Sequence, residues 1–151
     1  MAKKPLNELR EFLKPFPEDV CEVTLWLRDF VWAQYPDSNE LIYDNYNALV
    51  IAFGLSDKAP DVFCGIAVYA NYVNFGFLRG SEIPDPDKIL NGTGSLYRKL
   101  SVKDKKEFPR TAIKKLMKAA YANAQSRLKE KQTLKGKMMV KSVSIKKKRP
   151  K

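Results

Sequence analysis

Residues 41–80 read LIYDNYNALVIAFGLSDKAPDVFCGIAVYANYVNFGFLRG and hold most of the β-branched and aromatic residues of the chain. Turn-forming pairs at 44–45 and 70–71, and a polar loop over 56–61, divide this stretch into pieces of strand length. The pieces predict strands over 40–43, 46–55, 62–69 and 72–77. Short connections between consecutive strands favour an antiparallel meander. Because the second strand is apolar almost throughout, we expect helices or loops over part of its second face.

Helical patterns lie on both sides of these strands. Apolar residues recur at spacings of three and four from Val20 to Val31, which predicts a helix over 18–35. An edge strand is predicted over 96–102, and a second amphipathic helix over 109–129. We therefore expect an α+β fold, in which a twisted antiparallel sheet of about five strands is flanked by an N-terminal and a C-terminal helix.

The length of 151 residues fits one domain. Residues 1–17 contain three prolines and predict a loosely held N-terminal arm, and residues 18–130 form the predicted domain. Residues 131–151 contain nine of the 28 lysines and arginines and no acidic residue. This composition predicts a disordered basic tail. The net charge of +11 is then mainly a property of the tail, and the predicted domain is nearly neutral.

Several classes of chemistry are disfavoured by composition. The chain has no histidine, which excludes imidazole metal ligands and histidine acid–base catalysis. Cys21 and Cys64 form no CxxC pattern, so we expect two ordinary reduced thiols that are buried or half-buried. The N-terminus lacks the apolar segment of a signal peptide, and no apolar run approaches the length of a membrane span. We expect a cytoplasmic protein without a cofactor.

A loop with two glycines over 91–94, together with nearby arginines, suggests a binding site. Glycines allow backbone N–H groups to approach an anion, and arginine offers a planar bidentate partner. The predicted site consists of Arg79, Gly92, Thr93, Gly94, Arg98, Tyr43, Tyr46 and Asn74. The leading hypothesis is a non-enzymatic binding protein for a small anionic ligand or a peptide. The alternative is a structural turn, with both arginines paired to Asp85 or Asp87.

The tail offers a second functional hypothesis. Clustered lysines bind phosphate backbones through counterion release, without sequence preference. The residues predicted to do so are Lys146, Lys147, Lys148, Arg149 and Lys151. An anionic membrane surface is the other candidate partner. The alternative is a solvated terminus that only improves solubility.

The order of these segments resembles that of the YdhG-like family, which consists of small, mostly bacterial domains of unknown function. The resemblance spans residues 18–127 and rests on FLRG at 77–80, PDP at 84–86 and GTG at 92–94 followed by Arg98. It implies an α+β fold with a twisted antiparallel sheet between terminal helices. Some members are regarded as frataxin-like intracellular iron chaperones, so the resemblance also implies iron delivery as a further alternative.

Iron would need hard oxygen ligands, and acidic residues cluster at two places. The two clusters are Glu82, Asp85 and Asp87, and Glu18, Asp19 and Glu22. Both lie where a helix is predicted to begin, and acids at a helix N-terminus offset the helix dipole. We therefore expect no dedicated metal site.

Overall fold

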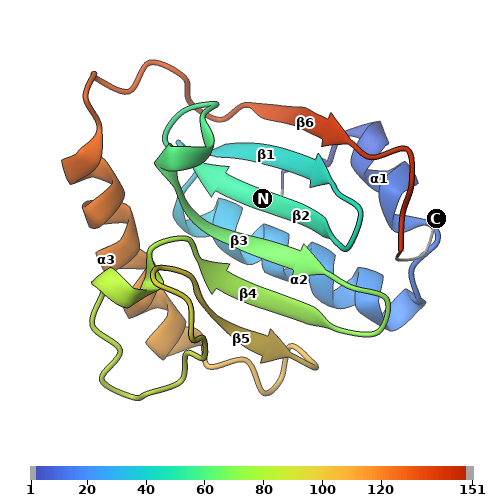
Figure 1. The fold of residues 1–151 in the computed structure, drawn as a ribbon, viewed down its shortest axis with the longest axis horizontal. Helices are drawn as coiled ribbons and strands as arrows, with labels where there is room; N and C mark the ends of the chain where they lie inside the picture. Colours follow the sequence, from blue (N-terminus) through green and yellow to red (C-terminus); the bar gives the residue numbers. More distant parts are fainter. Residues whose placement is uncertain (1–2, 149–151) are drawn as a thin grey trace.

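The computed structural model describes residues 3–148, which form a six-stranded mixed sheet and three α-helices (Figure 1). The sheet order is β5-β4-β3-β2-β1-β6. The strands are β1 (Asn39–Asp44), β2 (Leu49–Gly54), β3 (Val62–Val68), β4 (Val73–Phe77), β5 (Arg98–Val102) and β6 (Met138–Val143). The helices are α1 (Asn7–Leu13), α2 (Glu18–Gln34) and α3 (Arg110–Arg127), with 3-10 turns η1 (Ala59–Asp61) and η2 (Gly80–Glu82).

The expected α+β class is confirmed, and so are the two long helices. Strands β1 to β5 form the antiparallel meander, in which Ile51 of β2 pairs with Ile42 of β1 and Ile66 of β3. The expected number of strands is wrong, because β6 adds a sixth strand beside β1. It runs parallel to β1, so the sheet is mixed and not purely antiparallel.

The two faces of the sheet differ in side-chain size. Along β2, Leu49, Ile51 and Phe53 point to one face and join the main core, while Val50 and Ala52 point to the other. Helix α2 lies behind the sheet in Figure 1 and covers the face with the large residues. Helix α3 packs on the same side, where Tyr121 meets Phe63 at 5.1 Å between ring centroids. Among residues 3–148, no α-helix covers the opposite face, at whose edge the 3-10 turn η1 lies.

The N-terminal arm was expected to be loosely held, and this expectation is corrected for the described residues. Leu9, Leu13 and Phe16 are all buried in the main core. Leu9 and Leu13 are four residues apart and lie on one side of α1, and Phe16 follows in the turn before α2, so this segment closes one end of the core. Two of the three prolines that suggested a loose segment stand at positions 15 and 17, between the end of α1 and the start of α2, and the third, Pro5, precedes α1.

The disordered tail is also corrected. Residues 138–143 pair with β1, and beyond them the Ser144 amide donates to the Asp44 carbonyl at 2.7 Å. The Lys147 ammonium then lies 2.6 Å from the carboxylate of Asp44, whose side chain is fully buried. Disorder was the expectation because the segment is rich in lysine and has no acidic residue. The tail folds because its apolar run over 138–140 and one of these lysines have partners on the edge strand.

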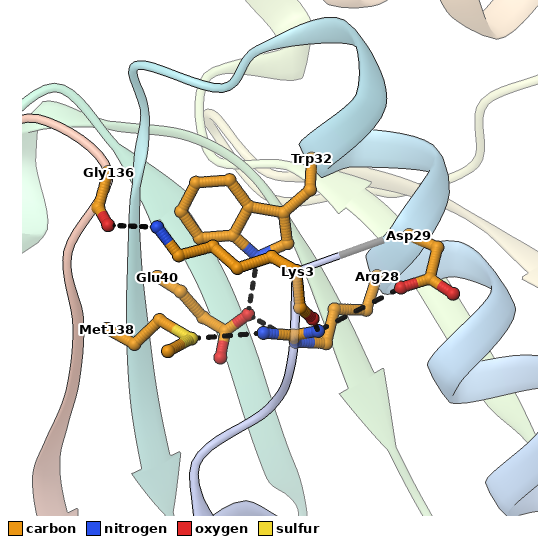
Figure 2. Close-up of polar contacts among 7 residues, drawn as sticks. All are labelled: Lys3, Arg28, Asp29, Trp32, Glu40, Gly136 and Met138. Carbon is orange, nitrogen blue, oxygen red and sulfur yellow. Dashed lines mark hydrogen bonds and ion pairs between the residues drawn. The ribbon is translucent and has the colours of Figure 1, made fainter. Parts of the chain in front are cut away.

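A buried ion pair ties the arm, α2 and two neighbouring strands together (Figure 2). Arg28 is 1 % exposed and donates from Nε to Oε1 of Glu40, which is 0 % exposed, at 2.6 Å. Trp32 Nε1 donates to the same oxygen at 2.8 Å. The other guanidinium nitrogens donate to the Lys3 carbonyl and to Sδ of Met138. One arginine on α2 therefore holds β1, the arm and the tail in place.

Both cysteines are free, as expected. Cys64 is buried, and burial raises the pKa of its thiol well above the usual range. Cys21 is half-buried, and burial raises its pKa, with Asp19 and Glu18 adding to the shift. A separate expectation concerned membrane spans: no helix within residues 3–148 has the length and apolar character to cross a bilayer.

Candidate functional site

The uncovered face of the sheet contains an apolar hollow of about 310 Å³. Its lining consists of Tyr43, Val50, Ala52, Ala59, Val62, Cys64, Gly65, Ile66, Ala67, Tyr69, Gly76, Leu78 and Tyr97. We call it the tyrosine hollow, with Ala52, Gly65, Ala67 and Gly76 as its floor and Tyr43, Tyr69 and Tyr97 as its walls. A volume of this size lies at the lower end of small-molecule pockets.

The floor arises from the register of three neighbouring strands. Ala52 of β2 pairs with Gly65 of β3, and Gly65 pairs with Gly76 of β4. Side chains alternate between faces, so these three small residues lie in one row across the sheet, while their large neighbours fill the core on the other side. The adjacent row contains Val50 of β2, Ala67 of β3 and Asn74 of β4. The hollow exists because the first row has almost no side-chain bulk and the second has no aromatic or long side chain on these three strands.

Tyrosines from three different segments form the walls. Tyr43 comes from β1, Tyr69 follows β3, and Tyr97 precedes β5. The Tyr69 ring stacks on Tyr72 with centroids 4.6 Å apart and planes at 11°. The Tyr97 ring lies over Gly76, where a Cβ atom would stand 2.7 Å from its Cζ. Glycine at position 76 is therefore what allows the Tyr97 ring to lie against the sheet.

The tyrosine hollow is electrically neutral. None of its lining residues is charged at neutral pH, and burial raises the pKa of all three wall tyrosines above their ordinary value. For Tyr97, burial together with the nearby Tyr69 raises the pKa to about 12. The phenol groups therefore stay protonated and offer hydrogen-bond donors and acceptors without charge.

Arg98 of the predicted glycine-loop site makes its hydrogen bonds within the loop itself. Arg98 donates from one guanidinium nitrogen to the carbonyls of Gly94 and Tyr97, at 2.7 and 2.8 Å. The expected partners Asp85 and Asp87 are not the ones it uses. Arg98 instead closes the loop on itself and holds the backbone of Tyr97. The loop therefore positions a wall of the tyrosine hollow.

Arg79 is engaged in the same region, through a different partner from those expected. Its guanidinium lies 2.8 Å from Glu82, and Asn123 of α3 donates to the other oxygen of that carboxylate at 3.0 Å. These bonds lower the pKa of Glu82, with the Asn123 hydrogen bond first among the causes. Glu82 therefore links η2 to α3, and Arg79 supports it from the other carboxylate oxygen.

Only part of the remaining predicted site is brought together. Tyr43 lines the tyrosine hollow, and Asn74 lies on the same sheet face, where its side-chain oxygen accepts from Ser101 at 3.0 Å. Tyr46 lies in the turn between β1 and β2, is 49 % exposed and is not part of the lining. Thr93 is exposed in the glycine loop.

The glycines of that loop differ in what they tolerate. Gly92 has a φ of +150°, and a Cβ there would stand 2.8 Å from the Tyr97 carbonyl oxygen, whereas Gly94 has nothing within 4 Å. We expect Gly92→Ala to lower the free energy of unfolding by about 1–3 kcal/mol, and Gly94→Ala to change it by less than about 0.5 kcal/mol. Urea denaturation of both variants measures this, and equal losses would contradict the geometry.

Sequence reasoning missed most of the hollow. Tyr69 and Tyr97 stand at the ends of predicted strands, and the floor residues are small residues inside them. A signal was present in the alternation of Asn74 and Gly76 with the large residues of β4. This alternation shows that the side chains on one face of β4 are small. It does not show that neighbouring strands align their small residues with it.

The basic residues predicted to bind nucleic acid differ in their contacts and exposure. Lys147 is committed to Asp44, and its ammonium also lies 5.7 Å from the centre of the Phe12 ring. Lys146 and Lys148 are exposed. The predictions for Arg149 and Lys151 fall outside the described residues.

Two carboxylates of the predicted acidic clusters, Asp85 and Glu82, form hydrogen bonds within the fold. Asp85 accepts from the amides of Ile89 and Leu90, and so caps the turn that follows it. Glu82 binds Arg79 and Asn123. Within residues 3–148, no group of three or more cysteine and acidic side chains is placed to hold a metal ion.

A scan against protein-family models, a search of curated proteins and a search of solved structures each found no match for this chain. The similarity to the YdhG-like family therefore stays a prediction from short motifs. Function has to be inferred from the geometry of the site, because a fold alone does not determine it.

Proposed function

We propose that the protein is a non-enzymatic binding module, and that the tyrosine hollow takes a small, neutral, largely apolar ligand that contains a flat ring. The observation that carries this proposal is the combination of a flat floor of small residues with three aromatic walls on an otherwise uncovered sheet face. Flat rings stack favourably on tyrosine, and the phenol groups orient polar substituents at the rim of the ring.

The neutral lining is the reason for preferring a neutral ligand to the anion expected from sequence. A carboxylate or phosphate placed in the tyrosine hollow would lose water without gaining a cation. Arg79 and Arg98 directly follow two lining residues in the sequence. Arg79 already binds Glu82, and Arg98 binds two carbonyls of the glycine loop. Neither has its guanidinium among the lining groups.

A matched pair of probes tests the proposal. We expect 2-naphthol to bind more tightly than 2-naphthoate, and to shift the amide NMR signals of Ala67 and Gly76. Tyr97→Ala should weaken 2-naphthol about tenfold, because it removes one aromatic wall. Tyr46→Ala is the control, since it deletes an exposed tyrosine outside the hollow, and it should leave the affinity unchanged.

Two results would contradict the proposal. The first is tighter binding of 2-naphthoate that is lost in Arg98→Ala, which would restore the anion site. The second is an equal loss of affinity in both tyrosine variants, which would indicate surface stacking without a pocket. Unchanged melting temperatures of both variants would show that the fold is intact.

The other functional hypotheses rest on the sequence. Nucleic-acid binding through the tail depends on Lys146 and Lys148 of the described residues, since Lys147 is engaged. Iron delivery depends on the YdhG-like resemblance alone. Location in the cytoplasm is likewise a prediction from composition.

A further inference from the structure

The positive charge of the chain is distributed unevenly, and the tail is only part of it. Residues 1–97 contain eight lysines and arginines against 14 acidic residues. Residues 98–131 contain twelve basic residues against three acidic ones. A net value for residues 1–130 hides this division, because an acidic part cancels a basic part. The basic part includes all of α3, which has no acidic residue in its 18 positions.

Three of these cations stand in a line on the outer surface of α3. Arg110, Lys114 and Lys118 are spaced by four residues, and all three are exposed. We call them the α3 basic stripe. Residues at i, i+4 and i+8 fall on the same side of a helix, and the stripe is about 12 Å long at 1.5 Å per residue. Lys115 is exposed beside it and shares two hollows with Asp87.

The α3 basic stripe is not neutralised within the described part of the protein. No carboxylate oxygen of residues 3–148 lies within 4.0 Å of Arg110, Lys114 or Lys118. Arg110 instead lies over the Trp26 ring, 5.2 Å from its centre. Like charges four residues apart repel, and cations in the first turn oppose the helix dipole. The charges on α3 therefore destabilise the helix, and a bound polyanion would reduce their mutual repulsion.

We infer that the α3 basic stripe binds the sugar–phosphate backbone of nucleic acid. A row of exposed cations on a rigid helix matches a row of phosphates, and binding of this kind is independent of base sequence. Trp26, over which Arg110 lies, is half-exposed and stacks with Phe30 at 5.6 Å between ring centroids. Phe108 packs edge-on against both rings, so only the exposed part of Trp26 beside Arg110 is open to an unpaired base.

A membrane surface fits this helix less well. Interfacial helices insert an apolar face into the lipid. The apolar residues of α3, among them Ile113, Leu116 and Met117, are buried against the sheet. The exposed side of α3 offers cations without an apolar strip next to them on the same helix.

The experiment measures binding of the full-length protein to a fluorescein-labelled duplex of about 20 base pairs and to a single strand of the same length, by anisotropy at several salt concentrations. One variant carries Lys114→Glu and Lys118→Glu. Its matched control carries Lys146→Glu and Lys148→Glu in the tail, so both variants have the same net charge.

We expect the α3 variant to weaken binding at least about 30-fold at about 50 mM salt, and the tail variant less than about fivefold. The slope of log K against log salt should fall by about two in the α3 variant, because two phosphate contacts are lost.

The α3 variant should also melt about 2–4 °C higher than the wild type. Lys114→Glu turns the repulsion of Arg110 into attraction, and Lys118→Glu does the same for Lys115, three residues away. Stability and affinity then move in opposite directions, which misfolding could not produce.

Several results would overturn the inference. The first is a wild type that binds neither nucleic acid at this low salt concentration. The second is an equal loss in both variants, which would indicate net charge alone, or a larger loss in the tail variant. The third is tighter binding to vesicles rich in phosphatidylserine, or equal competition by poly-glutamate, which would assign the stripe to a membrane or to an acidic protein.

Discussion

Arg28→Met is expected to lower the free energy of unfolding by about 3–5 kcal/mol, because it leaves the carboxylate of Glu40 buried without its cation. Glu40 is fully buried, and its Oε1 accepts from both Arg28 and Trp32. Among the described residues, Oε2 has no hydrogen-bond partner. The variant would also lose the bonds from Arg28 to the Lys3 carbonyl and to Met138. Chemical denaturation at constant pH measures the loss.

The loss should depend on pH. Burial raises the pKa of Glu40 above its ordinary value of 4.5, although Arg28 and the Trp32 hydrogen bond act in the opposite direction. A carboxyl group with a raised pKa in the folded state stabilises the fold at low pH, and this stabilisation is lost as the pH rises through the folded pKa. Removing Arg28 raises that pKa further. The penalty of Arg28→Met should therefore be smallest near about pH 5 and should grow towards about pH 8.

The double variant Arg28→Met/Glu40→Gln is the control. Glutamine keeps an acceptor for Trp32 and carries no charge, so the double variant should recover more than half of the loss. A pH-independent loss of equal size in the single and double variants would contradict this account. It would show that the packing of the arginine side chain matters and that the charge does not.

The sequence predicted the meander and both long helices because these depend on local patterns. Hydrophobic periodicity in residues 18–35 and 109–129, and alternation in 72–77, can be recognised within each segment without knowledge of its tertiary contacts. The partner of Arg28 is of another kind. Glu40 lies twelve residues away on a different element, and nothing in the local pattern shows that both side chains are buried together.

The candidate site was located only in part for a similar reason. The glycine loop and Arg98 were recognised as a unit, but their partner proved to be the backbone of Tyr97. The tyrosine hollow depends on the register of β2, β3 and β4, which aligns Ala52, Gly65 and Gly76. Register follows from tertiary packing, so composition and motif spacing cannot supply it.

Two neighbouring lysines of the tail should behave very differently when each is replaced by methionine. Lys147→Met removes the ammonium that lies 2.6 Å from the buried Asp44, and is expected to cost about 2–3 kcal/mol. This value stands below the usual range for a buried pair because the Lys147 side chain is 18 % exposed. Lys146→Met replaces an exposed residue with no ion pair in the described structure, and should change stability by less than about 0.5 kcal/mol.

Limited proteolysis shows which segment is loosened by Lys147→Met. In Lys147→Met the segment from 137 to 148 should be cut faster than in the wild type, because β6 is a half-exposed edge strand that loses its buried anchor. The double variant Asp44→Asn/Lys147→Met should restore part of the protection. A disordered tail would make the two lysines equivalent, since their sequence context is the same. Equal stability and equal cleavage of both single variants would therefore argue that β6 is not held on the sheet, whereas a difference between them would establish Asp44 as its anchor.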